Sequence, residues 1–346
     1  MEPFVSVFVP CKNEEAYITQ VMQDLGVQDY PPDRLEFLMI DGKSDDRTAE
    51  IIKEFAQSDH RFKYVLNESE TVPYAFNTAL KLAKGEVIVI MGAHSTYPRN
   101  YISELIKQLQ LTGADNVGGV LETLPAQPTP KCEAIASAMS SPFGMGNSAF
   151  RIGSDKVMEA DTVTFGCYRR SVFEKIGGFD TDLTRNQDDE FNGRLIASGG
   201  QILLIPWIKI GYFARKDYRS LWRMFFQYGY FKPLVMKKLG KPATLRQFAP
   251  PLFVLSLLLT SVAGFALPYA WIALGAIVTS WLLGAAFFGI NILSKKKLFS
   301  LLRLGHVVLA FATIHLSYGL GYLTGVLDFV LLGNRKPSLV NPVSSR

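Results

Sequence analysis

The chain has 346 residues, of which 48% are hydrophobic and 19% are charged, and its formal net charge is +5 at pH 7. These totals fit an ordinary globular protein, but charged and apolar residues mix only up to about residue 215, and the remainder is predominantly apolar. The basic residues beside the apolar part are interleaved with aromatic residues, which is typical of a membrane interface and argues against nucleic acid as a partner.

Cysteine usage and the N-terminus both indicate the cytoplasm for the polar part. Cys11, Cys132 and Cys167 show no CxxC spacing, so neither a zinc site nor a disulfide framework is expected. The apolar run 5–10 is too short for a signal peptide and leads directly into the charged segment 12–15. We therefore expect a reducing compartment.

Apolar runs and helical periodicity alternate along the polar part. After the apolar run 5–10, for example, Ile18, Val21 and Leu25 recur at helical spacing. This alternation predicts a mostly parallel sheet with helices on both faces. The expected strands are 5–10, 36–41, 62–66, 87–91 and 116–121, and the expected helices are 13–25, one from about residue 46, 73–83 and one that opens at 97–98.

Polar residues crowd the carboxyl ends of these strands. Asn13 and Glu14 follow the first strand, Asp41 and Asp46 follow the second, and His94 follows the fourth. Ligands of such sheets bind beyond the carboxyl ends of the strands. The sequence therefore predicts a binding site at this edge.

The apolar part predicts membrane-spanning helices. Residues 249–293 contain no Asp, Glu, Lys or Arg, and this run of 45 is about twice the roughly 20 residues that one crossing needs. Pro268 and Tyr269 interrupt it, so we expect a helical hairpin, followed by a third apolar segment at 304–327. Three crossings are favoured, although the glycines of the third segment also fit a close-packed or re-entrant pair.

Basic residues set the expected orientation of these helices. Nine Lys and Arg residues against one Asp lie between residues 215 and 246, and a further basic cluster begins at Lys295. The positive-inside rule places both clusters on the cytoplasmic side. The predicted organisation is a domain at 1–215, basic and aromatic interfacial helices at 216–248, a transmembrane region at 249–332 and a polar tail at 333–346.

Several ordered motifs resemble those of family 2 glycosyltransferases. The segments PCKNEE at 10–15 and MIDGKSDDRT at 39–48 resemble the opening of that family, and IGGFD at 176–180 and NQDDE at 186–190 resemble its acceptor half. The resemblance covers about residues 5–232 and is greatest for the succinoglycan-type membrane glucosyltransferases, which also carry a C-terminal membrane segment. It implies a GT-A nucleotide-diphospho-sugar transferase domain at 1–215.

The resemblance assigns Asp41 to the nucleotide of a UDP-sugar. A carboxylate suits the N–H of uracil, and Glu14 suits the ribose diol. Alternatively, Asp41 and Asp46 only cap the helix that starts near residue 46. The nucleotide-sugar-binding residues implied are Pro10, Asn13, Glu14, Asp41, Asp46, Asn77, Gly92, Ala93 and His94.

Relatives hold a divalent cation after the fourth strand with a D-x-D or D-A-H motif. This chain has Gly92 where the first carboxylate belongs, and His94 matches the last position. His94 is the one expected metal ligand, so the donor diphosphate would supply much of the coordination of Mn²⁺ or Mg²⁺. Alternatively no metal binds, and basic side chains or helix N-termini neutralise the diphosphate.

The catalytic base implied by the resemblance is Asp188. It matches the Asp of an E-D pair, with Gln187 in place of Glu, and lies in the first turn of a helix that Asn186 can cap. Alternatively, Asp188 and its acidic neighbours only complement the helix dipole. For Arg169 and Arg170, surface salt bridges remain the alternative. The implied acceptor and diphosphate side comprises Gly166, Arg169, Arg170, Gln187, Asp189, Arg194 and Gln227.

Together these features predict a membrane-anchored inverting glycosyltransferase with a cytoplasmic catalytic domain. Its expected donor is a UDP-hexose, with UDP-glucose suggested by the subgroup, and its acceptor is a saccharide on a polyprenyl-diphosphate carrier in surface polysaccharide synthesis. Two alternatives are a transferase that acts on polyprenyl monophosphate and a non-catalytic protein that binds sugar nucleotides. The second is suggested by Gly92 and Gln187.

Overall fold

The computed structural model describes residues 2–242 and 244–339, and these form two compact units. The first unit comprises the chain up to Glu122 together with Gly153–Tyr212. The second comprises Thr123–Ile152 and the chain from Phe213 onward. The segment Thr123–Ile152, which lies inside the predicted domain 1–215, thus groups with the helical unit. The predicted tail 333–346 lies outside the described residues from position 340 onward.

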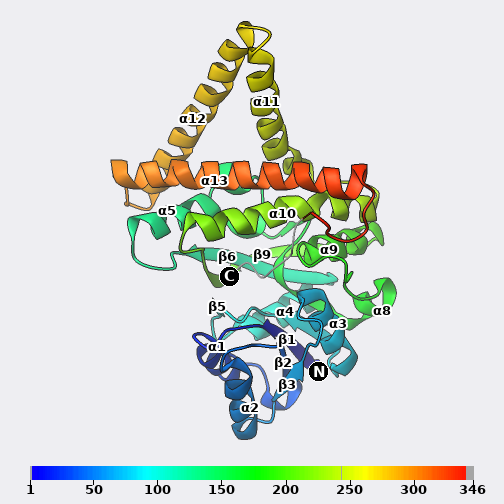
Figure 1. The fold of residues 1–346 in the computed structure, drawn as a ribbon. Helices are drawn as coiled ribbons and strands as arrows, with labels where there is room; N and C mark the ends of the chain where they lie inside the picture. Colours follow the sequence, from blue (N-terminus) through cyan, green and yellow to red (C-terminus); the bar gives the residue numbers. More distant parts are fainter. Residues whose placement is uncertain (1, 243, 340–346) are drawn as a thin grey trace. The chain divides into compact units, whose positions relative to one another are not determined.

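The first unit is built on a mixed sheet, which is nine-stranded over the described residues (Figure 1). Strands β1, β2, β3 and β4 pair in parallel, as the sequence predicts, whereas β8 pairs antiparallel with both β4 and β6. The order is β3-β2-β1-β4-β8-β6-β9-β5, with β7 beside β9. The strands are β1 (Val5–Cys11), β2 (Leu35–Asp41), β3 (Phe62–Leu66), β4 (Val87–Ile90), β5 (Ser95–Thr96), β6 (Asn116–Leu124), β7 (Met158–Glu159), β8 (Thr164–Arg169) and β9 (Ile202–Phe213).

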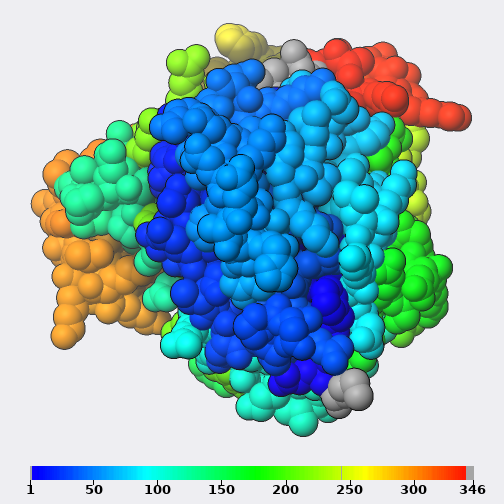
Figure 2. Space-filling view, turned by 90° about the horizontal axis from the view of Figure 1, so that it is seen from below, coloured from blue at the N-terminus to red at the C-terminus, as the bar shows by residue number. Residues whose placement is uncertain are grey.

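Burial explains why these segments form strands and helices. Every residue of β2 is buried, as is usual for an inner parallel strand covered on both faces. In α1 the apolar residues predicted to share one face, including Ile18 and Leu25, are buried against the sheet unit. Seen from below, the N-terminal part of the chain, in blue, forms a continuous surface (Figure 2). The helices of this unit are α1 (Ile18–Gly26), α2 (Thr48–Ser58), α3 (Val72–Leu82), α4 (Tyr101–Thr112), α8 (Arg170–Ile176) and α9 (Gln187–Ala197), with a short 3₁₀ turn at Pro32–Arg34.

The second unit is helical. Three of its segments, Leu245–Gly264, Tyr269–Lys295 and Leu301–Leu331, are long and apolar enough to cross a membrane. The predicted C-terminal helical region is therefore confirmed, with three long apolar helices. The helices are α5 (Pro130–Met139), α6 (Pro142–Met145), α7 (Ala149–Ile152), α10 (Tyr218–Leu239), α11 (Ala249–Gly264), α12 (Tyr269–Lys295) and α13 (Leu301–Gly325), with short helical turns at Leu245–Phe248 and Val326–Leu331.

Glycines allow α10 and α13 to pack with their backbones in contact. A Cβ on Gly321 would overlap the carbonyl oxygen of Phe226, and one on Gly325 would overlap that of Tyr230. From the other side, a Cβ on Gly229 would overlap the carbonyl oxygen of Tyr318. Small residues at such positions are what permits close helix approach.

The contact predicts opposite effects for two alanine substitutions in one helix. Gly321→Ala should destabilise the protein by about 1–3 kcal/mol, because the new methyl group forces the two backbones apart. Gly305→Ala is the matched control, since a Cβ there meets nothing within 4 Å, and it should stabilise α13 by about 0.5–1 kcal/mol. Thermal unfolding of both variants in detergent measures the difference, and equal melting temperatures would contradict this packing.

Candidate functional site

Hydrogen bonds join the loop after β1 to the loop after β2. Asn13 has a φ of 56°, a left-handed conformation that Asn adopts more readily than most residues. Its backbone N–H donates to Ser44 Oγ at 2.9 Å, and its side-chain Oδ1 accepts from the Asp45 N–H at 2.8 Å. Asn13 therefore joins two loops that leave neighbouring parallel strands.

A second group of hydrogen bonds connects these loops to the start of α2. The Glu14 N–H donates to Thr48 Oγ1 at 2.7 Å, and the Glu15 N–H donates to Asp46 Oδ2 at 3.1 Å. Asp46 Oδ1 also accepts from the Thr48 N–H at 3.0 Å, at the start of α2. These bonds to Thr48 and Glu15 hold the pKa of Asp46 below its usual value, against the opposing effect of burial. Asp46 thus accepts from the first N–H of α2 and ties the loops together.

Asp41, the last residue of β2, is 1% exposed. Its Oδ1 accepts from the Ser44 hydroxyl at 2.5 Å and from the Ser44 N–H at 3.2 Å, and its Oδ2 accepts from the Tyr64 hydroxyl at 3.1 Å. Burial, together with the charge and the hydrogen bond of Asp41, raises the pKa of Tyr64 to about 12. The Tyr64 hydroxyl therefore stays protonated and keeps donating, so the carboxylate is held in one orientation.

Glu14 and His94 lie beside this carboxylate edge. Glu14 is buried, and its Oε1 lies 3.4 Å from His94 Nδ1, which joins the end of β1 to the loop after β4. Cys11 stands in register with Asp41, and burial together with the charges of Asp41 and Glu14 raises the pKa of its thiol. The structure thus brings together Asp41, Glu14 and His94, which the sequence places at the ends of three adjacent strands.

The ring of Phe165 lies against Gly92. A Cβ on Gly92 would lie 2.7 Å from Phe165 Cζ, so no larger side chain fits there without displacing the ring. Phe165 has a φ of 53°, and its carbonyl oxygen accepts from the Tyr101 hydroxyl at 3.2 Å. This contact could not be predicted from the sequence, because it depends on β8 pairing beside β4.

In the part of the chain that the structure describes, the side chains do not by themselves form a metal site. Among the described residues, no group of three or more His, Cys, Asp and Glu side chains is arranged to hold a metal ion. Phe165 occupies the space of the missing carboxylate, which leaves His94 and its neighbour Glu14. Mg²⁺ in particular prefers oxygen ligands in octahedral geometry, which this pair does not supply.

Asp188 lies in the first turn of α9, as the sequence predicts. The helix begins after Asn186, which has a φ of 58°, and Asp188 Oδ1 accepts from the Asp189 N–H at 3.0 Å. Burial raises the pKa of Tyr168, and the charge of Asp188 raises it further. Tyr168 belongs to β8, and its ring lies where a Cβ on Gly166 would be.

Asn77 and Arg194, two of the predicted site residues, form hydrogen bonds with the backbone between α8 and α9. Asn77 makes a pair of hydrogen bonds with the backbone of Phe179, each of 2.8 Å. Arg194 forms a 2.5 Å ion pair with Glu190 and donates to the carbonyl oxygen of Gly178 at 2.7 Å. Both side chains therefore hold the chain that leads to Asp188.

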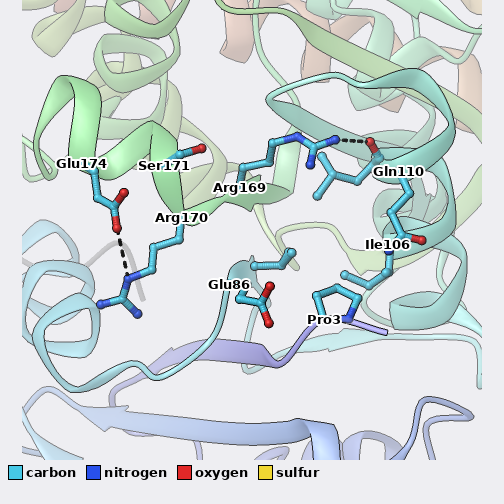
Figure 3. A pocket seen from close by; sticks show the side chains of 10 residues that line it. Pro3, Glu86, Ile106, Gln110, Arg169, Arg170, Ser171 and Glu174 are labelled. Atoms are coloured by element: carbon cyan, nitrogen blue, oxygen red, sulfur yellow. Dashed lines mark hydrogen bonds and ion pairs between the residues drawn. The ribbon is translucent and has the colours of Figure 1, made fainter. Parts of the chain in front are cut away.

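Arg169 and Arg170 lie at the opposite end of the strands from His94. Because β8 runs antiparallel to β4, Arg169 pairs with Val87 at the start of β4. Arg169 donates to the carbonyl oxygens of Leu109 and Ala114, and Arg170 donates to those of Ala83 and Gly85. They line a pocket that includes Glu86 and Glu174 (Figure 3). The structure does not bring this pair to the carboxyl edge, and their hydrogen bonds account for them as parts of the fold.

The remaining predicted residues fall into three settings. Pro10 lies in β1 and Ala93 is buried after β4, both at the carboxyl edge. Gln187 and Asp189 flank Asp188 in α9. Gln227 is buried in α10, in the helical unit. No role is predicted from the sequence for Ser44 and Thr48, which belong to the motif at 39–48, or for Phe165, which precedes the predicted site residue Gly166. Tyr64 is not among the predicted site residues.

Known proteins share this architecture. Residues 6–177 match the family description "Glycosyl transferase family 2". A dolichyl N-acetyl-alpha-D-glucosaminyl phosphate 3-beta-D-2,3-diacetamido-2,3-dideoxy-beta-D-glucuronosyltransferase from Methanococcus voltae is 32% identical over 244 residues, which cover 68% of this chain and 74% of that protein. The succinoglycan biosynthesis protein ExoA of Rhizobium meliloti is 26% identical, over 93% of this chain and 95% of its own.

A solved structure supports the same fold. The mannosyltransferase PcManGT from Pyrobaculum calidifontis, in complex with GDP-Man and Mn²⁺, superimposes with a TM-score of 0.58 at 22% identity, over 93% of this chain and 88% of its own. The sheet unit thus has the fold of GT-A glycosyltransferases. With the motifs at the carboxyl edge and the relatives above, the chain belongs to glycosyl transferase family 2, and it is a glycosyltransferase.

Proposed function

We propose that this protein is a membrane-anchored, inverting glycosyltransferase that moves a hexose, most simply glucose, from a UDP-sugar to a saccharide on a polyprenyl-diphosphate carrier. The observation that carries the proposal is the convergence of Asp41, Glu14 and His94 at the ends of three neighbouring strands. The apolar hairpin and the basic flank support a catalytic unit that faces the cytoplasm from the inner or plasma membrane. The product would enter surface polysaccharide synthesis.

The nucleotide is proposed to bind at Asp41. The Oδ2 atom of its carboxylate accepts from the Tyr64 hydroxyl at 3.1 Å and from the Ser44 N–H at 3.4 Å, and that N–H is shared with Oδ1 at 3.2 Å. The uracil N–H either joins the Tyr64 hydroxyl at this atom or displaces it. Glu14, 3.4 Å from His94, is proposed to bind the ribose diol. In this arrangement the diphosphate lies toward Gly92, Ala93 and His94.

Asp188 is proposed to act as the general base. As the acceptor hydroxyl attacks the anomeric carbon, its proton passes to the Asp188 carboxylate, and the bond to UDP breaks on the opposite face of the sugar. The position in the first turn of α9 and the braces from Asn77 and Arg194 support this role, because they fix the backbone around the carboxylate. Neither the proton transfer nor the departure of UDP uses a side chain at position 92.

Acceptor chemistry separates this proposal from its first rival. The Methanococcus voltae relative is named for a dolichyl phosphate-linked sugar, which favours a saccharide hydroxyl as nucleophile. A polyprenyl monophosphate acceptor is already ionised and needs no base. The second rival, a protein that binds sugar nucleotides without turnover, is motivated by Gly92 and by Gln187 in place of Glu.

Replacement of Asp41 tests the nucleotide site. Asp41→Asn removes a charge-assisted hydrogen bond of about 1.5–3 kcal/mol and should weaken UDP binding roughly 10- to 150-fold. Tyr64→Phe is the matched control, because it removes the neighbouring donor and should leave UDP binding as tight as before or tighter. Calorimetric titration of both purified variants measures the effect, after thermal unfolding has established that each is folded. If Asp41→Asn bound UDP as tightly as the unaltered protein, the Asp41 carboxylate would serve only to order the loop after β2.

Replacement of Asp188 tests the chemistry. With labelled sugar nucleotides and extracted lipid carriers, Asp188→Asn should lower the rate of transfer about 10²- to 10⁴-fold and leave UDP affinity unchanged. The control Asp33→Asn removes an equal charge from a side chain that is 80% exposed and should retain full activity. A full rate in Asp188→Asn would favour the monophosphate acceptor. UDP binding without transfer in the unaltered protein, with any donor and with or without Mn²⁺, would favour the non-catalytic rival.

A further inference from the structure

The helix α13 is apolar enough to cross a membrane, yet it lies side by side with a helix that is not. From start to end its partner is α10, and the two run in the same direction. The Tyr218 hydroxyl bonds His306 Nδ1 at 2.9 Å near the start, and Lys237 Nζ donates to the carbonyl oxygen of Phe329 at 2.8 Å near the end. Between these points Gly321 rests on the backbone of Phe226. The pair therefore shares one orientation along its whole length.

The basic residues of α10 limit where the pair of helices can lie relative to a membrane. Arg219, Arg223, Lys232, Lys237 and Lys238 are distributed over the helix, and all except Lys232 are exposed. A Lys or Arg near the centre of a crossing helix costs about 2.5–3.5 kcal/mol. A bilayer that enclosed α13 from end to end would also enclose these side chains, so the pair fits the membrane surface instead.

Contacts between α13 and the hairpin lead to the same arrangement. Gly319 meets Pro250 and Val254 in the first turns of α11, whereas Leu304 meets Gly289 near the end of α12. The 15 residues from Leu304 to Gly319 span about 22 Å of helix, so α13 runs across the base of the hairpin rather than along it. Figure 1 shows α11 and α12 rising from α13 as two legs.

The hairpin tip is free of α13. Phe265 and Tyr269, on either side of the break between α11 and α12, are 86% and 81% exposed. Trp271 packs edge-on against Phe265. Aromatic side chains at this position suit the far interface of a bilayer. A third crossing helix would instead carry its last turns to the level of this tip.

We propose that only the hairpin α11–α12 enters the hydrocarbon as a spanning element, and that α13 lies in the membrane surface beside α10, so that the described residues after α13, up to Leu339, lie on the face from which the hairpin departs. The exposed leucines of α13, among them Leu301 and Leu309, then lie at the boundary of headgroups and acyl chains. Arg335 and Lys336 join the other basic clusters on one face, whereas three crossings would separate them.

Cysteine labelling of the full chain in sealed, oriented membrane vesicles tests this arrangement. Lys295→Cys and Lys336→Cys flank α13 and are both at exposed positions. With a membrane-impermeant maleimide, both should react from the same face and neither from the other. The unsubstituted chain is the blank, since Cys11, Cys132 and Cys167 are all buried. Reaction of Lys336→Cys from the opposite face, or from neither face, would overturn the proposal.

A depth measurement distinguishes the two arrangements independently. Spin labels at Leu309→Cys, near the middle of α13, and at Leu283→Cys, near the middle of α12, occupy side chains that are 48% and 67% exposed. The label at 283 should be accessible to oxygen and protected from a polar nickel reagent. The label at 309 should show the reverse preference, because it lies close to the headgroups. Equal depth at both positions would contradict the surface placement of α13.

Discussion

The candidate site depends on the hydrogen bonds that fasten the loop after β1 to the loop after β2. Parallel pairing sets Cys11 opposite Asp41, which brings the two strand ends together. Beyond the strands, Asn13 and Ser44 carry the connection forward, at 2.9 Å. The loops have no regular ladder of their own, so these side-chain bonds decide where the Glu14 and Asp41 carboxylates stand. These hydrogen bonds extend the fixed geometry of the strand ends into the loops that carry the polar side chains.

Close packing determines what this edge lacks. The ring of Phe165 occupies the space in which a side chain at Gly92 would lie. A side chain larger than that of Gly92 would therefore have to displace this ring. Tyr97 supports the same corner, since its hydroxyl accepts from the Gly92 N–H at 2.6 Å. The departure from the motif is thus part of a consistent local structure.

Much of the sheet edge could be predicted from the sequence, because alternating strands and helices determine which residues follow each parallel strand. Asp41 and His94 illustrate this. The antiparallel half could not be predicted, since the direction of β8 is a tertiary property. For that reason Arg169 matched a family motif and yet lies opposite Val87, at the other edge. Similarly, length and hydropathy of α13 predict a membrane span, whereas its contact with α10 through Gly321 is visible only in the fold.

Asp41 and Asp188 are proposed to serve one reaction at one edge of the sheet. An experimental structure of the full chain with UDP and a lipid-linked acceptor measures this directly. We expect the uracil N–H within hydrogen-bonding distance of the Asp41 carboxylate and the acceptor hydroxyl about 3 Å from an oxygen of Asp188. A nucleotide bound away from Asp41, or an Asp188 side chain that opens into a separate cavity, would contradict it.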